Sequence, residues 1–509
     1  MLSNNRQLGL NLIASVAIYI VQYSISLVLT PYIINKLGVA AYGFVGLSTQ
    51  IIGYSSLITI ALNSMAGRFV SIEYYKGNIE KANKYFSSVF YSNVIISAFL
   101  FLISFVLVIY LDCLINIPRE LIIDVKLLFA FLSLNSILGI IANVYSVSTF
   151  IKNRLDYANI KNIIGNIIRA IVLVSCFTLF SPKVWYFGFT TILCSIYILY
   201  TNYIFYKKAT PELLIRKRYY NKKCIIDLIK SGSWNVLTKL SRIFEDGLNL
   251  LIANIFIGAK LAGTLALSVT VPTMINSVTA MMASNFAPSW TQLYASNDKT
   301  KMLTEILKSV RIMGFIASIP VAVFFVYGDM FFSLWVPTQN AMQLYWLSVA
   351  GSFVMVFAMP LETLWNIFTI TNQVKKSSIN LLENSLIMFA IVMIGMFVVK
   401  DNIVRLFIIA STKSIVASIR TLTFLPMQGA KCLGYPIKTF YPPVLKNLVC
   451  IFLISSMAFF IRIFFIPNSW FGLITGTIIT CIIGLVYNFY ISFNRCDRNY
   501  FINKIKAFI

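Results

Sequence analysis

The stretch LGVAAYGFVGLS, residues 37–48, recurs in altered form 220 positions later as IGAKLAGTLALS, residues 257–268. Glycine and leucine are common in membrane helices, so the match gains its weight from its position. It aligns the first apolar segment of the chain with the seventh, and the second with the eighth. The sequence therefore predicts an internal repeat. The two copies have the same residue at four aligned pairs of positions, namely Gly38 and Gly258, Gly43 and Gly263, Leu47 and Leu267, and Ser48 and Ser268.

The composition around this repeat predicts a membrane protein. Of 509 residues, 59% are hydrophobic and only 12% are charged. A soluble domain carries about 25% charged residues, so water could not solvate this surface. Because a chain in lipid must satisfy its own backbone polar groups, we expect an all-α polytopic protein.

Apolar windows of about 20 residues, enough to cross the hydrocarbon core, recur along the whole chain. Both repeat copies enter the membrane in the same direction, because an offset of six spans is even. Parallel repeats predict two six-helix bundles around a central cavity, followed by two further helices. The predicted divisions are residues 1–206, a linker at 207–231, a second bundle at 232–424, and 425–509. The fourteen predicted spans are 8–29, 42–65, 87–111, 127–149, 163–181, 186–206, 232–257, 262–284, 312–334, 343–366, 379–399, 402–424, 448–466 and 471–493.

The net charge of +25 has two readings, a nucleic-acid groove or membrane topology. With the N-terminus placed in the cytoplasm, the inside segments carry 29 Lys and Arg and the outer loops carry 6. This asymmetry is the positive-inside pattern. We therefore expect both termini in the cytoplasm and no nucleic-acid partner.

The sequence lacks the residue type that most often acts as a catalytic base or metal ligand. The chain has no histidine, and its eight cysteines include no C-x-x-C pair, so the sequence predicts neither a metal site nor a resident cofactor. The longest outer loop, residues 112–126, is too short to hold an acceptor and catalytic carboxylates, which speaks against an enzyme. The basic linker at 207–227 is interpreted as a solvated cytoplasmic connection. The alternative is recruitment of anionic lipid or substrate.

Span seven, GSWNVLTKLSRIFEDGLNLLIANIFIG at 232–258, carries a polar stripe. Its members are spaced 4, 3, 4 and 3 apart, which places them within about 80° on a regular helix. A basic residue at mid-membrane costs about 2.5–3.5 kcal/mol, so this stripe is expected to line water or pack against another polar stripe. An alternative is that Arg242 and Asp246 neutralise each other at i+4. The stripe consists of Asn235, Lys239, Arg242, Asp246 and Asn249.

Two further spans carry charge. Arg169 lies in span five and Lys413 in span twelve, and for both we keep two readings, cavity lining and helix-end anchoring. Arg405, Arg420 and Arg462 are expected to reach the interface from span ends. Excess positive charge predicts a cargo with anionic groups, such as phosphate, pyrophosphate or acidic sugars. The candidate cavity residues are Asn235, Lys239, Arg242, Asn249, Arg169 and Lys413.

Two carboxylates stand out as candidates for ion coupling. Glu245 and Asp246 lie within span seven, and a carboxylate in a membrane cavity can titrate near neutral pH. We therefore regard both as candidates to couple transport to protons or sodium.

Two stretches resemble the polysaccharide flippases, which are the O-antigen and capsule repeat-unit transporters of the multidrug/oligosaccharidyl-lipid/polysaccharide (MOP) exporter superfamily. They are SLVLTPYIINKLGVAAYGFVGLSTQII at 26–52 and EDGLNLLIANIFIGAKLAGTLALS at 245–268. Pro31 ends span one, and Asp246 falls where such flippases often carry an acid. Gly247 stands where an arginine often follows that acid, so by resemblance the pairing role passes to Arg242.

The resemblance implies transport of undecaprenyl-pyrophosphate-linked oligosaccharide from the inner to the outer leaflet of a bacterial cytoplasmic membrane. The product would be O-antigen, capsule or exopolysaccharide, and the motion alternating access through a cationic cavity. It also implies membrane lipids, a polysaccharide polymerase and a chain-length regulator as partners.

Three rivals stay open. A drug/cation antiporter of the same superfamily would favour an acidic or aromatic cavity. A lipid II flippase would carry arginines in the first two spans, where Lys36 is the one charge between Leu8 and Met65. A membrane glycosyltransferase or polymerase would need larger outer loops.

Overall fold

The computed structural model describes residues 4–492, apart from positions 153, 288–289, 291–292, 295–297, 372 and 466–467, together with residue 498. Every regular element in this part of the chain is a helix. The expected all-α polytopic class is therefore confirmed.

Eleven of the described helices are long and apolar enough to cross a membrane, and two bent helix pairs raise the number to thirteen. The bends are 59° between α2 (Val39–Gly53) and α3 (Ser56–Tyr75), and 44° between α15 (Ala341–Ser352) and the helix that follows. This arrangement makes the protein a multi-pass membrane protein, but the predicted count of fourteen is not reached.

The predicted span that does not qualify is span seven. The structure divides it among α9 (Lys222–Arg242), one turn of π-helix, η3 (Ile243–Gly247), and α10 (Asn249–Phe256). Span seven is interrupted by this π-turn and carries several charged side chains. For both reasons it is not one continuous apolar helix.

The chain packs as two compact units, residues 1–266 and 267–509. This division lies within the second repeat copy. The predicted boundaries at 206 and 232 follow the repeat instead, and they stay a prediction.

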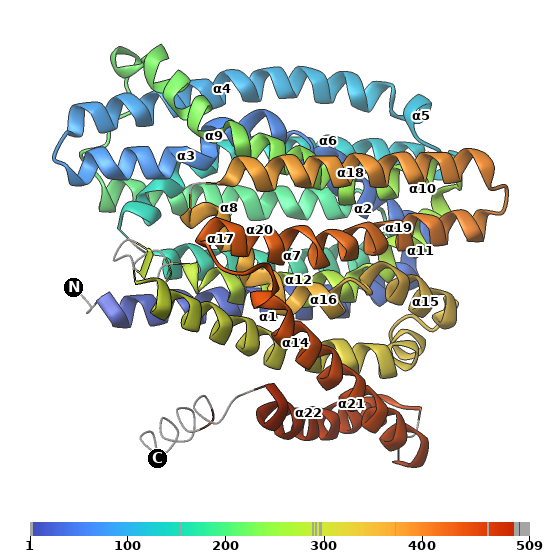
Figure 1. Cartoon of the computed structure of the whole chain (residues 1–509). Helices are drawn as coiled ribbons and strands as arrows, with labels where there is room; N and C mark the ends of the chain where they lie inside the picture. The colour runs from blue at the N-terminus through green and yellow to red at the C-terminus, as the bar shows by residue number, and fades with distance from the viewer. Residues whose placement is uncertain are drawn as a thin grey trace. The chain divides into compact units, whose positions relative to one another are not determined.

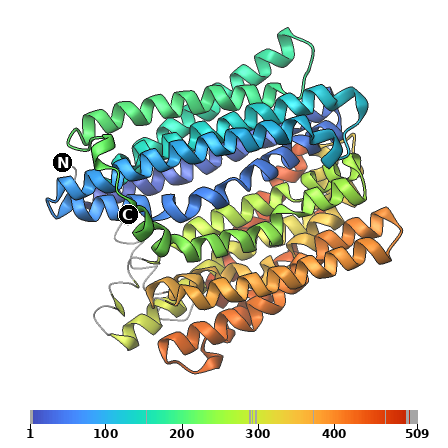
Figure 2. The same ribbon diagram turned by 90° about the horizontal axis from the view of Figure 1, so that it is seen from above.

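The first unit is a bundle in which α6 packs along α8, α3 along α9 and α1 along α7. Its helices, blue to green in Figures 1 and 2, run roughly alongside one another. A core cluster centred on Phe86, Val70 and Leu228 joins α4, α3 and α9. The remaining helices of this unit are α1 (Asn4–Leu37), α4 (Ile79–Ile109), α5 (Leu111–Leu114), α6 (Ile122–Ile151), α7 (Leu155–Leu179), α8 (Tyr186–Ala209) and most of α11 (Ala259–Ser268).

The second unit contains α14, which packs against α21 and α22. The last two helices lie side by side (Figure 1). A core around Trp290, Phe368 and Phe440 fills the other part of this unit. Its helices are α12 (Thr270–Ser284), α14 (Lys299–Trp335), α15, α16 (Met355–Leu361), α17 (Trp365–Ile370), α18 (Val374–Val398), α19 (Asn402–Leu422), α20 (Phe424–Leu433), α21 (Tyr441–Phe465) and α22 (Trp470–Ser492).

The basic linker is docked on α4 through its backbone. Asn83, Ser87 and Ser88 are buried, and each exchanges hydrogen bonds of 2.8–3.3 Å with backbone groups of residues 212–221. All eight Lys and Arg side chains between positions 207 and 230 are nevertheless exposed. The backbone of the linker is thus held on α4 by hydrogen bonds, while its charged side chains are exposed to solvent.

The arginines near span ends behave differently from one another. Arg462 on α21 makes a forked ion pair with Asp329 on α14, with N–O distances of 2.7 and 2.6 Å. Arg420 is 7% exposed and stacks over Trp365, with its guanidinium carbon 5.8 Å from the ring centroid. Each of these two arginines therefore has a partner within the second unit, and the expectation that they reach the interface stays a prediction.

Candidate functional site

The repeat glycines occupy matching structural positions. Gly38 and Gly258 have φ angles of 84° and 117°, a backbone region that favours glycine, and each begins the turn into the next helix. Gly43 and Gly263 touch each other: a Cβ on Gly43 would lie 2.8 Å from the Cα of Gly263, and one on Gly263 would lie 2.4 Å from the carbonyl oxygen of Val39. The four glycines thus allow α2 and α11 to cross at backbone contact.

The bend in span two meets the π-turn in span seven. Tyr54 lies between α2 and α3, and its hydroxyl donates a hydrogen bond to the carbonyl oxygen of Gly247 in η3. A Cβ on Gly247 would approach Cε1 of Tyr54 to 2.9 Å. Two broken helices are therefore held together at their breaks, where π-turns are often functional.

The polar stripe is regular only in its first half. Asn235, Lys239 and Arg242 lie on α9 and keep the spacing of an α-helix. Because η3 is π-helical, the angle per residue assumed above does not extend to Asp246 and Asn249. The stripe thus follows one face of an α-helix up to Arg242, and this regular spacing ends at η3.

The acid bound by Arg242 is Glu245. Arg242 Nη1 lies 3.4 Å from Oε2 of Glu245, whose side chain is 4% exposed, whereas the arginine side chain is 47% exposed. Asn249 Nδ2 donates a bond of 3.2 Å to the backbone oxygen of Glu245, and Asp246 is half-buried beside it. A buried carboxylate is therefore covered by a half-exposed guanidinium, with Lys239 half-buried one turn earlier on α9.

The other predicted cations lie farther along the chain. Arg169 on α7 has its guanidinium carbon 6.0 Å from the ring centroid of Phe187 on α8, within the first unit. Lys413 lies on α19 in the second unit. Whether these residues share one cavity with the stripe stays a prediction.

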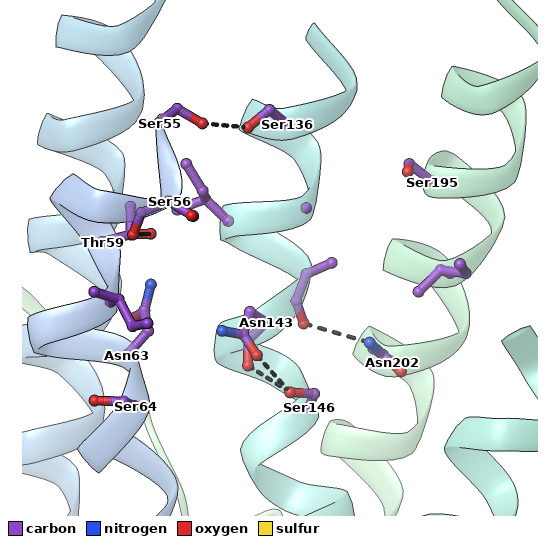
Figure 3. Close-up of a pocket in the computed structure, with 15 residues that line it drawn as sticks. Ser55, Ser56, Thr59, Asn63, Ser64, Ser136, Asn143, Ser146, Ser195 and Asn202 are labelled. Atoms are coloured by element: carbon purple, nitrogen blue, oxygen red, sulfur yellow. Dashed lines mark hydrogen bonds between the residues drawn. The ribbon is translucent and has the colours of Figure 1, made fainter. Parts of the chain in front are cut away.

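A pocket that the sequence did not predict lies within the first unit (Figure 3). It has a volume of about 580 Å³ and is walled by α3, α6 and α8. Ten of its fifteen lining residues are Ser, Thr or Asn, and none of the fifteen is charged. Charges within apolar spans are conspicuous in a sequence, whereas Ser, Thr and Asn are common in membrane helices, so the sequence gives no signal for this pocket.

One hydrogen bond joins this pocket to the stripe. Asn235 Nδ2 donates to Oγ of Ser64, a pocket residue, over 3.0 Å. Asn235, one of the residues predicted to line the cavity, thus contacts the pocket wall. The described residues contain no group of His, Cys, Asp or Glu that could hold a metal ion.

Comparison with known proteins gives matches in sequence and in structure. The model of a family described as "Polysaccharide biosynthesis protein" matches residues 8–294. The uncharacterized membrane protein EpsK of Bacillus subtilis (strain 168) is 28% identical over 372 residues, which is 73% of this chain and 73% of EpsK.

Two solved structures share the fold. One is an inward-facing multidrug resistance MATE family transporter of the MOP superfamily, with a TM-score of 0.65 at 15% identity, covering 82% of this chain and 94% of the transporter. The other is the lipid II flippase MurJ in an inward closed conformation, with a TM-score of 0.64 at 14% identity, covering 94% and 97%. At such identities the likeness concerns the fold alone.

Proposed function

The chain belongs to the polysaccharide biosynthesis protein family, and from this premise we propose that it flips lipid-linked oligosaccharide repeat units across the membrane. The cargo is an undecaprenyl-pyrophosphate-linked oligosaccharide, moved from the inner to the outer leaflet for O-antigen, capsule or exopolysaccharide. The observation that supports this best is the half-exposed Arg242 at the end of α9, within predicted span seven and one turn after Lys239. Cations at that depth are costly and suit an anionic ligand.

In this proposal Lys239 and Arg242 bind the pyrophosphate. Arg242 Nη1 lies 3.4 Å from Oε2 of Glu245, and 47% of the arginine side chain is exposed, so an incoming diphosphate can reach the guanidinium. Arginine forms forked, charge-assisted bonds with phosphate, which favours the exchange. Asn235, Asn249, Arg169 and Lys413 are proposed as further substrate contacts.

The same exchange supplies a route to ion coupling. When the diphosphate engages Arg242, it shares the guanidinium with the buried Glu245. We propose that Glu245, with Asp246 beside it, takes up a proton or binds sodium at this step, and that release of the cargo reverses it.

The proposed setting is a bacterial cytoplasmic membrane with both termini in the cytoplasm, and the motion is alternating access. A polysaccharide polymerase and a chain-length regulator are the proposed protein partners, since they use the flipped unit.

The test is rescue of a bacterial strain that lacks its own repeat-unit flippase, scored by surface polysaccharide, with dye efflux measured in parallel. We expect restored polysaccharide without efflux. The Lys239→Ala/Arg242→Ala variant should lose the polysaccharide while its amount in the membrane stays the same.

A matched control is Lys230→Ala/Lys260→Ala, which removes two exposed cations flanking the same span and should retain export. Efflux without polysaccharide would move the chain to the drug exporters. Full export by Lys239→Ala/Arg242→Ala would reject the cationic binding site.

A further inference from the structure

We infer that the pocket walled by α3, α6 and α8 is a binding subsite for the uncharged sugar residues of the cargo, hexoses or N-acetylhexosamines. The inference rests on the proposed function and names a second part of the substrate, distinct from the diphosphate. Its basis is a juxtaposition: an uncharged pocket of hydroxyls and amides joined by one hydrogen bond to a cationic helix face.

The amides of the pocket leave complementary polar atoms for a ligand. The Oδ1 atoms of Asn63 and Asn143 accept bonds from Asn93 and Ser146, at 2.9 and 3.1 Å, which leaves both Nδ2 groups as donors. Asn202 instead donates its Nδ2 to a backbone oxygen, at 3.4 Å, which leaves its carbonyl as an acceptor. Figure 3 shows Asn63 on α3 opposite Asn143 on α6, with Asn202 on α8. A sugar hydroxyl both donates and accepts, and therefore matches this set.

Size and shape agree with a sugar. The volume of about 580 Å³ lies within the usual range of small-molecule sites, about 300–1,000 Å³. Ile140 and Ile198 add aliphatic surface, which suits the C–H face of a pyranose. At Gly139 a Cβ would meet no atom within 4 Å, so the α6 backbone forms an open wall of the pocket.

The lining disfavours other occupants. A cation would call for carboxylates, and none of the lining residues carries one. A lipid tail would leave the ten hydroxyl and amide side chains of the lining without polar partners from the ligand. Hydroxyl-rich, uncharged ligands remain the class that these side chains can satisfy.

The hydrogen bond between Asn235 and Ser64 connects the two subsites. Asn235 precedes Lys239 by four residues, which is about 6 Å along a helix. A diphosphate at Lys239 and Arg242 therefore brings the first sugar next to the pocket wall. The stripe would hold the charged group and the pocket the neutral one.

The experiment measures binding to the purified full chain in lipid nanodiscs. The probes are farnesyl diphosphate alone and farnesyl diphosphate linked to glucose, galactose or N-acetylglucosamine. We expect at least one sugar-bearing probe to bind about tenfold more tightly than the bare one, as two or more neutral hydrogen bonds would give.

Two variants remove this gain by different means. Asn143→Leu removes a donor, and Gly139→Leu fills the pocket without deleting any hydrogen bond. Both should bind the bare probe as the native chain does. Gly139→Ala, which finds open space, and Asn384→Leu, a half-buried asparagine on α18 outside the pocket, should keep the gain.

Each outcome decides a separate point. Equal binding of bare and sugar-bearing probes by the native chain would reject the sugar subsite but not the flippase. A gain that survives in both Asn143→Leu and Gly139→Leu would also reject it. Binding of none of the probes would reject the proposed function and the subsite together.

Discussion

Two ion pairs within predicted spans differ in how tightly they hold their arginine. Arg462 and Asp329 form a forked pair with distances of 2.7 and 2.6 Å, and Arg462 also donates to the backbone oxygen of Val326. Arg242 Nη1 lies 3.4 Å from Oε2 of Glu245, and nearly half of the arginine side chain is exposed. The first pair uses its arginine for structure, whereas the second leaves much of its arginine surface accessible to a ligand.

The difference separates charges that stabilise the bundle from charges that can serve transport. Both arginines are unexpected in an apolar span, and sequence alone does not rank them. The geometry does, because the short forked pair engages both terminal nitrogens of Arg462, whereas nearly half of the Arg242 side chain is exposed to a ligand. A third pair, Asp112 with Lys126 at the end of α4, is exposed and extends the comparison to the surface.

The largest effect is expected at Arg462. Replacing it by Ala leaves Asp329 without its partner, and we expect the free energy of unfolding to fall by about 3 kcal/mol, at the low end for buried pairs because both side chains are partly exposed. Thermal unfolding of the purified protein measures it. The double variant Arg462→Met/Asp329→Leu removes both charges and should recover most of the loss. If both variants were equally unstable, the pair would not be the cause.

The same chemical change should act differently on the two acids. Glu245→Gln removes the charge facing a half-exposed arginine, so we expect a change in stability of about 1 kcal/mol or less, together with loss of polysaccharide export. Asp329→Asn is the matched control and should lower stability while the remaining folded protein still exports. The reverse pattern, a stable Asp329→Asn and an unstable Glu245→Gln, would contradict the comparison.

The smallest effect is expected at Asp112. Its hydrogen bond with Lys126, whose Nζ lies 2.6 Å away, holds the pKa of the carboxyl below its ordinary value. A lowered folded-state pKa stabilises the fold above the unfolded pKa of about 3.9, and the contribution disappears as pH falls through the folded value.

Melting temperatures between pH 7 and pH 3 measure this contribution. The native chain should lose slightly more stability on acidification than Asp112→Asn, which lacks the titrating group. Identical acid profiles of the two proteins would show that the surface pair contributes nothing.

Much of the fold followed from patterns that the bilayer imposes. Long apolar windows predicted thirteen of the spans that the described helices support, with bent pairs counted once. The repeat predicted Gly38 and Gly258 as equivalent, and both adopt positive φ. These features can be predicted from sequence because the lipid and the backbone sterics directly restrict which residue types can occupy each position.

What the sequence did not predict depends on contacts between distant segments. The π-turn at η3 broke the assumed helical spacing after Arg242, and Tyr54, which bonds to that turn, lies 193 residues earlier. Docking of the linker required Asn83 and its neighbours on α4. The pocket arose from serines and asparagines on three helices, and such residues are unremarkable in each helix alone. No pattern within a single segment of the sequence predicts these long-range contacts.

The glycine crossing also bears on how the two repeat copies depend on each other. Gly43 and Gly263 are equivalent positions that touch, and each has room for hydrogen only. Were the copies two identical separate chains, one mutation would place two methyl groups at this point. In a single chain the same mutation places one, but because both positions are already glycine, neither side can give up bulk to receive it. A change at either position alone therefore already forces the two helices apart.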